Sequence, residues 1–277
     1  MSENVVGGGE VGARVERAEV DAIVGAVRAA EGRGAGGFVR EFGGGAACFA
    51  EPGSPLNKVV GIGFGEIPSS AEWDEVEAAY AVVGVPVQVE LAHIADPRIG
   101  AELTGRGYRL MSFEDVLGIE LAGRAWAAPA GVEVRRLDED GFDTWLDLAV
   151  DGFAHPDEDG LPAHEEFPRE ALAAVMRDMA ANGDTRIYIA YRDGVPAGAA
   201  NMRVADGIAS LAGASTLVAH RRHGVQTALL SARLTEATAD GCDLAVVTTQ
   251  PGSKSQRNAQ GRGFSLLHTR AVLVKEV

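Results

Sequence analysis

The chain has 277 residues, a formal net charge of −15 and 46% hydrophobic residues. This length is sufficient for two domains, and the acidic excess argues against nucleic acid as a partner, because phosphate binding needs clustered Lys and Arg. No apolar run reaches the ~18 residues of a membrane span and no secretory signal is visible, so we expect a cytoplasmic protein that does not bind membranes.

Hydrophobic periodicity predicts alternating helices and strands over residues 1–121. Helices are expected at 15–30, 70–83 and 97–104, and strands at 46–50, 56–64, 85–91 and 112–121. The segment 122–131 is rich in Ala, Gly and Pro, which is typical of a linker between two domains.

A similar pattern begins again after the linker. Strands are expected at 132–137, 186–191, 195–204, 208–217, 244–249 and 266–275, and helices at 142–153, 168–180 and 226–239, with a short helix before the last strand. The dipeptides Asp193-Gly194 and Asp206-Gly207 predict tight turns that join three consecutive strands into a meander.

The two halves share an internal repeat. LTGRGYRL at 103–110 resembles AQGRGFSL at 259–266, and each follows an apolar strand and precedes a long β-rich ending. A duplicated domain explains this order of elements; a chance match of so short a segment is the alternative.

One turn carries the chemistry. Residues 221–226 read Arg-Arg-His-Gly-Val-Gln and stand between a strand and the start of a long helix. The first N–H groups of a helix lack internal partners and attract anions, and Gly224 lets the chain approach a phosphate closely. We therefore expect a phosphate or pyrophosphate here, with a plain loop bearing surface arginines as the alternative. The other Gly-rich segment, 61–65, lacks the third glycine of a dinucleotide-binding motif because position 66 is Glu66.

Arg221-x-x-Gly224-x-Gln226 resembles the Q/R-x-x-G-x-G/A signature of the GNAT superfamily of N-acetyltransferases. Ser255-Gln-Arg-Asn258, followed by Gly263-Phe264, is similar to a second segment of that family. The resemblance implies an α/β (α+β) protein with two GNAT-like domains, each a mixed, mainly antiparallel twisted sheet flanked by helices. Residues 132–277 would be the acetyltransferase domain, and residues 1–121 a degenerate copy without a CoA signature that helps to wall the acceptor pocket.

The resemblance also implies which residues contact acetyl-CoA, the expected co-substrate. They are Thr216, Leu217, Val218, Arg221, Arg222, His223, Gly224, Val225, Gln226, Thr227 and Asn258. Arg221 would either support the phosphates or brace the turn. The chain departs from the family pattern at Gln226, where Gly or Ala is preferred, and it lacks a Tyr after Asn258 that would protonate the departing thiolate.

The family mechanism implies direct attack of a small-molecule or peptide amine on the thioester in a ternary complex, which requires a base for the ammonium proton. The candidates are His155, Asp157, Asp159, His164, Glu165 and Glu166. A solvated polar loop is the alternative interpretation of these residues. No metal is expected, and the chain would be a monomer or a homodimer. A non-catalytic acyl-CoA sensor and a purely structural protein are the competing functions.

Overall fold

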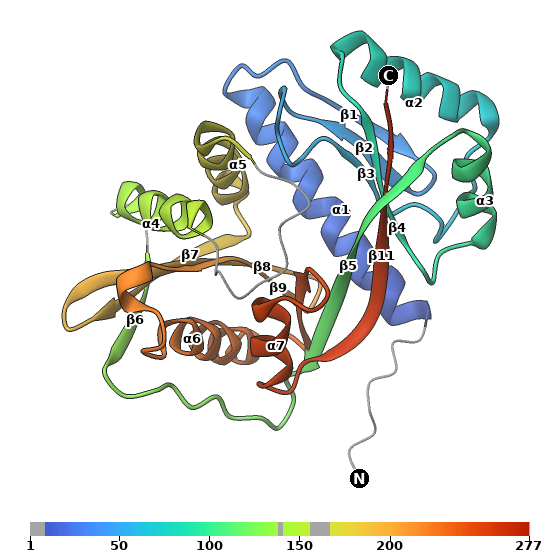
Figure 1. The fold of residues 1–277 in the computed structure, drawn as a ribbon. Helices are drawn as coiled ribbons and strands as arrows, with labels where there is room; N and C mark the ends of the chain where they lie inside the picture. Colours follow the sequence, from blue (N-terminus) through green and yellow to red (C-terminus); the bar gives the residue numbers. More distant parts are fainter. Residues whose placement is uncertain (1–8, 138–140, 156–166, 277) are drawn as a thin grey trace.

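The strands of both halves pair into a sheet of 11 strands with the order β1-β2-β3-β4-β11-β5-β10-β9-β8-β7-β6 (Figure 1). The computed structural model describes residues 9–137, 141–155 and 167–276. Two neighbouring pairs, β3 with β4 and β9 with β10, are parallel, and the other pairs are antiparallel. The predicted fold class, a mainly antiparallel mixed sheet flanked by helices, is confirmed, but the strands of the two predicted sheets form one sheet.

The elements of the first half follow the predicted order. They are α1 (Gly9–Gly32), β1 (Phe38–Phe42), β2 (Gly45–Phe49), β3 (Lys58–Val60), α2 (Ser70–Val83), β4 (Val87–Ala92), α3 (Pro97–Gly105) and β5 (Arg109–Glu120). Helix α2 has the predicted bounds because Ser69 and Glu72 form a capping box and Gly84 ends the helix in the left-handed conformation. Strand β1 was not predicted, since its central residues Arg40 and Glu41 are exposed and interrupt the apolar pattern.

The second half also agrees closely with the predicted elements. They are β6 (Val132–Leu137), α4 (Phe142–Ala154), α5 (Arg169–Ala181), β7 (Thr185–Arg192), β8 (Val195–Ala205), β9 (Ile208–Thr216), a short 3-10 turn η1 (Val218–His220), α6 (Val225–Ala239), β10 (Leu244–Thr249), α7 (Lys254–Gln260) and β11 (Ser265–Lys275). Asp193 and Asp206 both have positive φ angles before glycine, so the two predicted tight turns are present.

The last strand of each half is exchanged with the other half. Strand β11 pairs with β4 of the first half along residues 270–275, and β5 pairs with β10 of the second half along residues 115–120. The exchanged strands also pair with each other at the middle of the sheet. The two halves therefore share the central strands of one sheet. The linker at residues 122–131 does not separate two sheets, and its role as a domain boundary stays a prediction.

The helices cover both faces of this sheet. Clusters of buried side chains place α1, α4 and α5 on one face, and α2, α3, α6 and α7 on the other. Helix α1 lies along its face across the junction of the two halves (Figure 1), where Val15 and Ala18 pack on Val116 and Leu267 of the exchanged strands. Among the described helices, none is both long and apolar enough to cross a membrane.

A buried group of charged side chains fixes α1 to the exchanged strands. Glu16 of α1 accepts hydrogen bonds from His268 Nε2 at 2.6 Å and from Arg270 Nε at 2.8 Å, both on β11. Burial alone would raise the pKa of Glu16, but Arg270 and His268 outweigh it and hold that pKa below its usual value. The carboxylate of Glu16 is therefore charged and paired inside the protein.

The same buried group extends to the neighbouring strands. Glu90 of β4 is paired with Lys58 of β3, and Arg270 Nη1 lies 3.8 Å from carboxylate oxygens of Glu90 and of Glu114 on β5. The Glu90 carboxylate, together with burial, raises the pKa of Glu114 to about 7. Because folding raises the pKa of Glu114, the free energy of folding depends on pH.

Candidate functional site

A cleft opens where β9 and β10 separate. The two strands pair only from Ile208 opposite Leu244 to Ser210 opposite Val246. Beyond these positions each strand continues without the other, as far as Thr216 on β9 and Thr249 on β10. The facing edge of β9 therefore presents backbone groups that have no partner strand, which is a suitable surface for an extended ligand.

A β-bulge in β9 helps to turn it away from β10. The register with β8 passes from Ala199 opposite Ser215 to Asn201 opposite Ala212, so β9 carries one extra residue. Gly213 adopts a φ of +60° there, and a Cβ on it would lie 2.8 Å from the Asn201 side-chain nitrogen. A glycine is required at this position by both the backbone conformation and the close contact.

The predicted turn lies at the wide end of this cleft. Gly224 is the N-cap of α6 with φ 80° and ψ 3°, and no side chain caps the helix. The first helical hydrogen bond joins Ala228 N–H to Gly224 C=O at 2.9 Å, so the N–H groups of the preceding turn have no partner within the helix. Gly224, Val225, Gln226 and Thr227 all line the cleft, which places an open helix N-terminus at the cavity.

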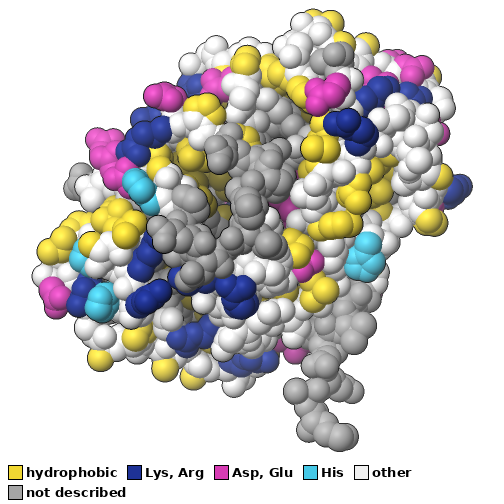
Figure 2. Space-filling view, viewed as in Figure 1, with side chains coloured by type: hydrophobic (Ala, Val, Ile, Leu, Met, Phe, Trp, Pro, Cys, Tyr) yellow, Lys and Arg dark blue, Asp and Glu magenta, His cyan; other side chains and the backbone are white. Residues whose placement is uncertain are grey.

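The cleft is a cavity of about 810 Å³ between β9, α6, β10, α7 and the end of α4. Its described lining contains no Asp or Glu, although the chain as a whole carries a net charge of −15. The cationic lining residues are Arg221, Arg222, Arg233, Lys254, Arg257 and Arg262. Figure 2 shows Lys and Arg side chains gathered on the part of this face that lies over α6 and α7. Such a cavity favours a ligand with several negative charges.

Arg233 is the most deeply buried of these cations. It belongs to α6, is 3% exposed, and donates from Nη1 to Asn201 C=O at 2.8 Å and to Ala212 C=O at 3.3 Å. Burial lowers the pKa of Arg233 to about 10. These bonds tie α6 to the bulged region of β9 and add positive charge beneath the cavity.

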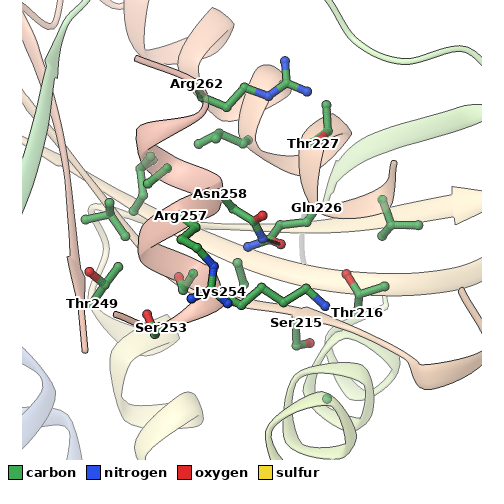
Figure 3. A pocket seen from close by; sticks show the side chains of 18 of the residues that line it. Ser215, Thr216, Gln226, Thr227, Thr249, Ser253, Lys254, Arg257, Asn258 and Arg262 are labelled. Atoms are coloured by element: carbon green, nitrogen blue, oxygen red, sulfur yellow. Dashed lines mark hydrogen bonds between the residues drawn. The ribbon is translucent and has the colours of Figure 1, made fainter. Parts of the chain in front are cut away.

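Helix α7 forms the opposite wall and is held by the exchanged strand. Gln256 donates to the buried carboxylate of Asp115 on β5 at 2.6 Å, and Ser253 caps the helix by accepting from Gln256 N–H at 3.1 Å. Figure 3 shows Lys254 extending from the start of this helix toward Thr216 on β9. A strand of the first half therefore positions a wall of the cavity in the second half.

Two predicted cofactor contacts instead meet each other across the cleft. Asn258 of α7 donates from its side-chain nitrogen to the side-chain oxygen of Gln226 in the first turn of α6, at 2.6 Å (Figure 3). A Gly or Ala at position 226 would leave no acceptor for Asn258. The departure of Gln226 from the family pattern thus has a structural consequence, a hydrogen bond that spans the cavity.

Arg221 braces the turn, which is one of the two roles expected for it. Its Nε donates to Thr216 C=O at 3.3 Å, and its Nη2 donates to the backbone carbonyl of His155 at the end of α4. One guanidinium therefore connects the end of β9 to the end of α4.

The cavity brings together most of the predicted site residues. Those that line it are His155, Thr216, Arg221, Arg222, Gly224, Val225, Gln226, Thr227 and Asn258. Leu217, Val218 and His223 are not among the lining residues, and Leu217 N–H is already bonded to Ala197 C=O at 3.0 Å. The base candidates Asp157, Asp159, His164, Glu165 and Glu166 lie outside the described residues.

The corresponding place in the first half is closed. Strands β3 and β4 are also parallel and pair only at Val59 and Val89, but Asp96 N–H then donates to Gly63 C=O at 3.0 Å and joins the loops that follow the two strands. The N-terminus of α2 is occupied by its own Ser69 and Glu72 capping box. Neither an open cleft nor a free helix N-terminus is present there.

No group of His, Cys, Asp or Glu side chains within the described ranges is arranged to hold a metal ion. Cys48 and Cys242, the two cysteines of the chain, are both free and buried. Burial raises the pKa of Cys48 to about 12, so this thiol is unreactive at neutral pH.

Comparison with known proteins gives a family match and several similar folds. Residues 122–247 match a family model described as an acetyltransferase (GNAT) domain. A GCN5-related N-acetyltransferase from Kribbella flavida is similar over 96% of this chain and 95% of its own, with 20% sequence identity and a TM-score of 0.68. No curated protein matches the sequence.

Two further solved structures share the fold. A tandem GNAT protein from the clavulanic acid biosynthesis pathway is similar over 87% of this chain and 78% of its own, with 16% identity and a TM-score of 0.59. A GCN5-related N-acetyltransferase from Sphaerobacter thermophilus covers 74% of this chain and 66% of its own, with 16% identity and a TM-score of 0.55. At these identities the likeness concerns the fold alone.

Proposed function

We propose that this chain, in which residues 122–247 match the GNAT acetyltransferase domain model, is a GNAT enzyme that transfers an acetyl group from acetyl-CoA to an amine. The observation that carries the proposal is the uncapped N-terminus of α6, with Gly224 at its start, opening into a cavity whose described lining is cationic and free of carboxylates. A CoA diphosphate suits this combination of unpaired N–H groups, helix dipole and arginines.

The dimensions and edges of the cavity also suit the rest of the molecule. Its volume of about 810 Å³ lies within the range of small-molecule sites, ~300–1,000 Å³. The unpaired edge of β9 beyond Ser210 offers backbone groups to an extended, amide-containing chain such as the pantetheine arm. The hydrogen bond between Asn258 of α7 and Gln226 of α6 crosses the cavity, so the pantetheine arm would have to pass it on its way along β9.

We expect one acetyl-CoA site per chain, in the second half. The loops after β3 and β4 are joined by the Asp96 to Gly63 hydrogen bond, and Glu72 occupies the N-terminus of α2. A carboxylate at that helix end would repel a diphosphate. The first half would then serve to support α7 through Asp115 rather than to bind a cofactor.

Calorimetric titration of the full chain with acetyl-CoA tests the proposal. We expect saturable binding with one site per chain and a Kd in the micromolar range, roughly 1–100 µM, as is usual for an enzyme substrate. Thiol release from acetyl-CoA with a panel of small amines and peptides then measures transfer. Absence of binding would refute the proposal, whereas binding without transfer to any amine would favour an acyl-CoA sensor.

The hydrogen bond between Gln226 and Asn258 is expected to compete with the cofactor. Replacing Gln226 with alanine frees the Asn258 amide and removes a bond that must open for the arm to enter; an exposed neutral hydrogen bond contributes ~1 kcal/mol, so affinity for acetyl-CoA should rise about fivefold. Calorimetry on the wild type and Gln226→Ala measures this change. Weaker binding by the variant would mean that the Gln226 side chain serves the cofactor instead.

A further inference from the structure

We propose that the Nε2 atom of His155 takes the proton from the acceptor amine, and that Arg221 positions His155 for this step. The assignment rests on the proposed acetyl transfer. It supplies the base that the third meander strand, β9, does not contain, since residues 208–216 include no Asp, Glu or His.

The end of α4 is anchored on the strand that lines the cavity. Ser215 Oγ on β9 donates to Leu148 C=O at 2.9 Å, and a Cβ on Gly152 would lie 2.2 Å from the Ser215 Cβ. Helix α4 therefore lies in close contact with β9 one turn before it ends. His155 follows as the C-cap residue and lines the cavity together with Gly152 and Phe153.

A hydrogen bond fixes which nitrogen of His155 can accept a proton. Its Nδ1 lies 2.9 Å from the backbone oxygen of Asp151. A carbonyl oxygen can only accept, so Nδ1 must carry the hydrogen and donate it. In the neutral ring the lone pair then lies on Nε2, which is the arrangement a general base requires.

Arg221 connects the backbone of His155 to the turn that is proposed to bind the cofactor. Its Nη2 donates to the carbonyl of His155, its Nε donates to Thr216 C=O at 3.3 Å, and its own backbone begins the turn that leads to Gly224. A diphosphate that orders the turn would thereby also hold the end of α4. Arg221 is a positioning residue in this account, because it acts through His155.

His220 is the other histidine of the cavity lining. It lies in η1, directly before the cationic turn, and its Nδ1 is buried without a hydrogen-bond partner among the described residues. No hydrogen bond at Nδ1 fixes the tautomer of the His220 ring, unlike that of His155. His220 also lies next to the turn proposed to bind the diphosphate. The described lining contains no carboxylate that could act in place of either histidine.

The proposed step balances in atoms and electrons. An ammonium acceptor gives one proton to His155 Nε2, and the freed nitrogen lone pair forms the N–C bond to the thioester carbonyl carbon. The C–S bond then breaks and sulfur keeps the electron pair. The second proton lost by nitrogen goes to the thiolate and His155 releases its proton to water, so the products are an amide, a free thiol and one proton.

Nitrogen-15 NMR of the full chain tests the tautomer without any acceptor. The His155 ring is identified by its loss in His155→Gln, and two-bond couplings distinguish protonated from unprotonated nitrogens. We expect hydrogen on Nδ1 and none on Nε2 in the neutral ring. Hydrogen on Nε2 would overturn the assignment, whether or not acetyl-CoA binds, and a failure of the proposed function would show separately as absent calorimetric binding.

Thiol-release kinetics test the role itself, using the amine of the panel that reacts fastest. His155→Gln should lower kcat by roughly 10²–10⁴-fold with little change in the KM for acetyl-CoA. The loss should shrink for a weakly basic acceptor such as hydroxylamine, which arrives already unprotonated. His93→Gln, an exposed histidine of the first half, is the matched control and should retain full activity.

Variants of Arg221 separate positioning from proton transfer. Arg221→Met should lower kcat, and Arg221→Lys should restore part of it by donating again to the His155 carbonyl. A kcat unchanged in His155→Gln, or an equal loss in His220→Gln, would overturn the proposal. The first result would favour Glu165 or Glu166, two of the other base candidates from the sequence, as the base.

Discussion

Replacing Gly224 with alanine is expected to weaken acetyl-CoA binding by about 100-fold, the equivalent of ~2.7 kcal/mol. Gly224 holds a φ of +80° at the N-cap of α6, where an L-residue costs ~1 kcal/mol. An added Cβ would also lie 3.1 Å from Pro129 Cγ and 3.2 Å from its Cβ, so either Pro129 or the turn must shift slightly to make room, and we expect the turn to shift. That shift would move the N–H groups that face the cavity, and calorimetry with acetyl-CoA measures the loss.

The opposite end of the same helix supplies the matched control. Gly241, just beyond α6, has a φ of +79° and no atom within 4 Å of an added Cβ. Gly241→Ala therefore carries the same backbone penalty without touching the cavity. We expect both variants to lower the free energy of unfolding by at least ~1 kcal/mol, Gly224→Ala by more because of its contact with Pro129, and only Gly224→Ala to lose affinity. Equal affinities in the two variants would show that the turn is not an anion site.

The sequence predicts most helices and strands here because their signals are local. The Asp193-Gly194 and Asp206-Gly207 turns fix the meander β7-β8-β9, since few other dipeptides accept positive φ at consecutive positions. The turn before α6 was predicted for the same reason, as a helix start needs only its own few residues. Strand β1 is the exception, because exposed Arg40 and Glu41 hide its period.

The exchange of β5 and β11 could not be predicted from the same pattern. Both strands follow a similar Gly-Arg-Gly-aromatic segment, and both are long and rich in β-branched or apolar residues. Either could pair with β4 or with β10 on local grounds. The choice depends on contacts far apart in sequence, such as the bond from Asp115 on β5 to Gln256 on α7.

The candidate site divides in the same way. Gly224 and Arg221 were found because they belong to a contiguous motif, whereas Arg233 enters the cavity from the buried side of α6 and reaches carbonyls of β8 and β9. The one signal for Arg233 in the sequence is its position on the largely apolar face of the helix α6. Likewise, the link from Arg221 to His155 joins residues 66 positions apart, so the sequence offered both residues but not their contact.

Replacing Arg270 with methionine is expected to lower the free energy of unfolding by ~3–5 kcal/mol, the usual cost of removing one partner from a buried ion pair. Arg270 is 1% exposed, donates to Glu16 at 2.8 Å, and has Nη1 at 3.8 Å from carboxylates of Glu19, Glu90 and Glu114. The variant leaves the buried carboxylate of Glu16 without this cation, and it removes positive charge from beside buried Glu90 and partly exposed Glu19 and Glu114. Urea denaturation of the full chain measures the change.

An exposed arginine is the matched control for this variant. Arg135 is 53% exposed and pairs with Glu133 on the same strand. Because water screens such a pair, Arg135→Met should change the free energy of unfolding far less than Arg270→Met in the same assay. A similar cost for Arg270→Met would mean that the buried group contributes little to holding α1 on the exchanged strands.

The pH dependence gives a second readout of the same group. The Glu90 carboxylate and burial raise the pKa of Glu114 to about 7 from a usual value of 4.5, so the protonated form is favoured by folding. The stability contributed by this proton is fully present below pH 4.5 and is lost as the pH rises through about 7. Without Arg270 the carboxylates repel each other more strongly, so the cost of Arg270→Met should be greater at pH 8 than at pH 6. An equal cost at both pH values would contradict this electrostatic account, because simple loss of packing does not titrate.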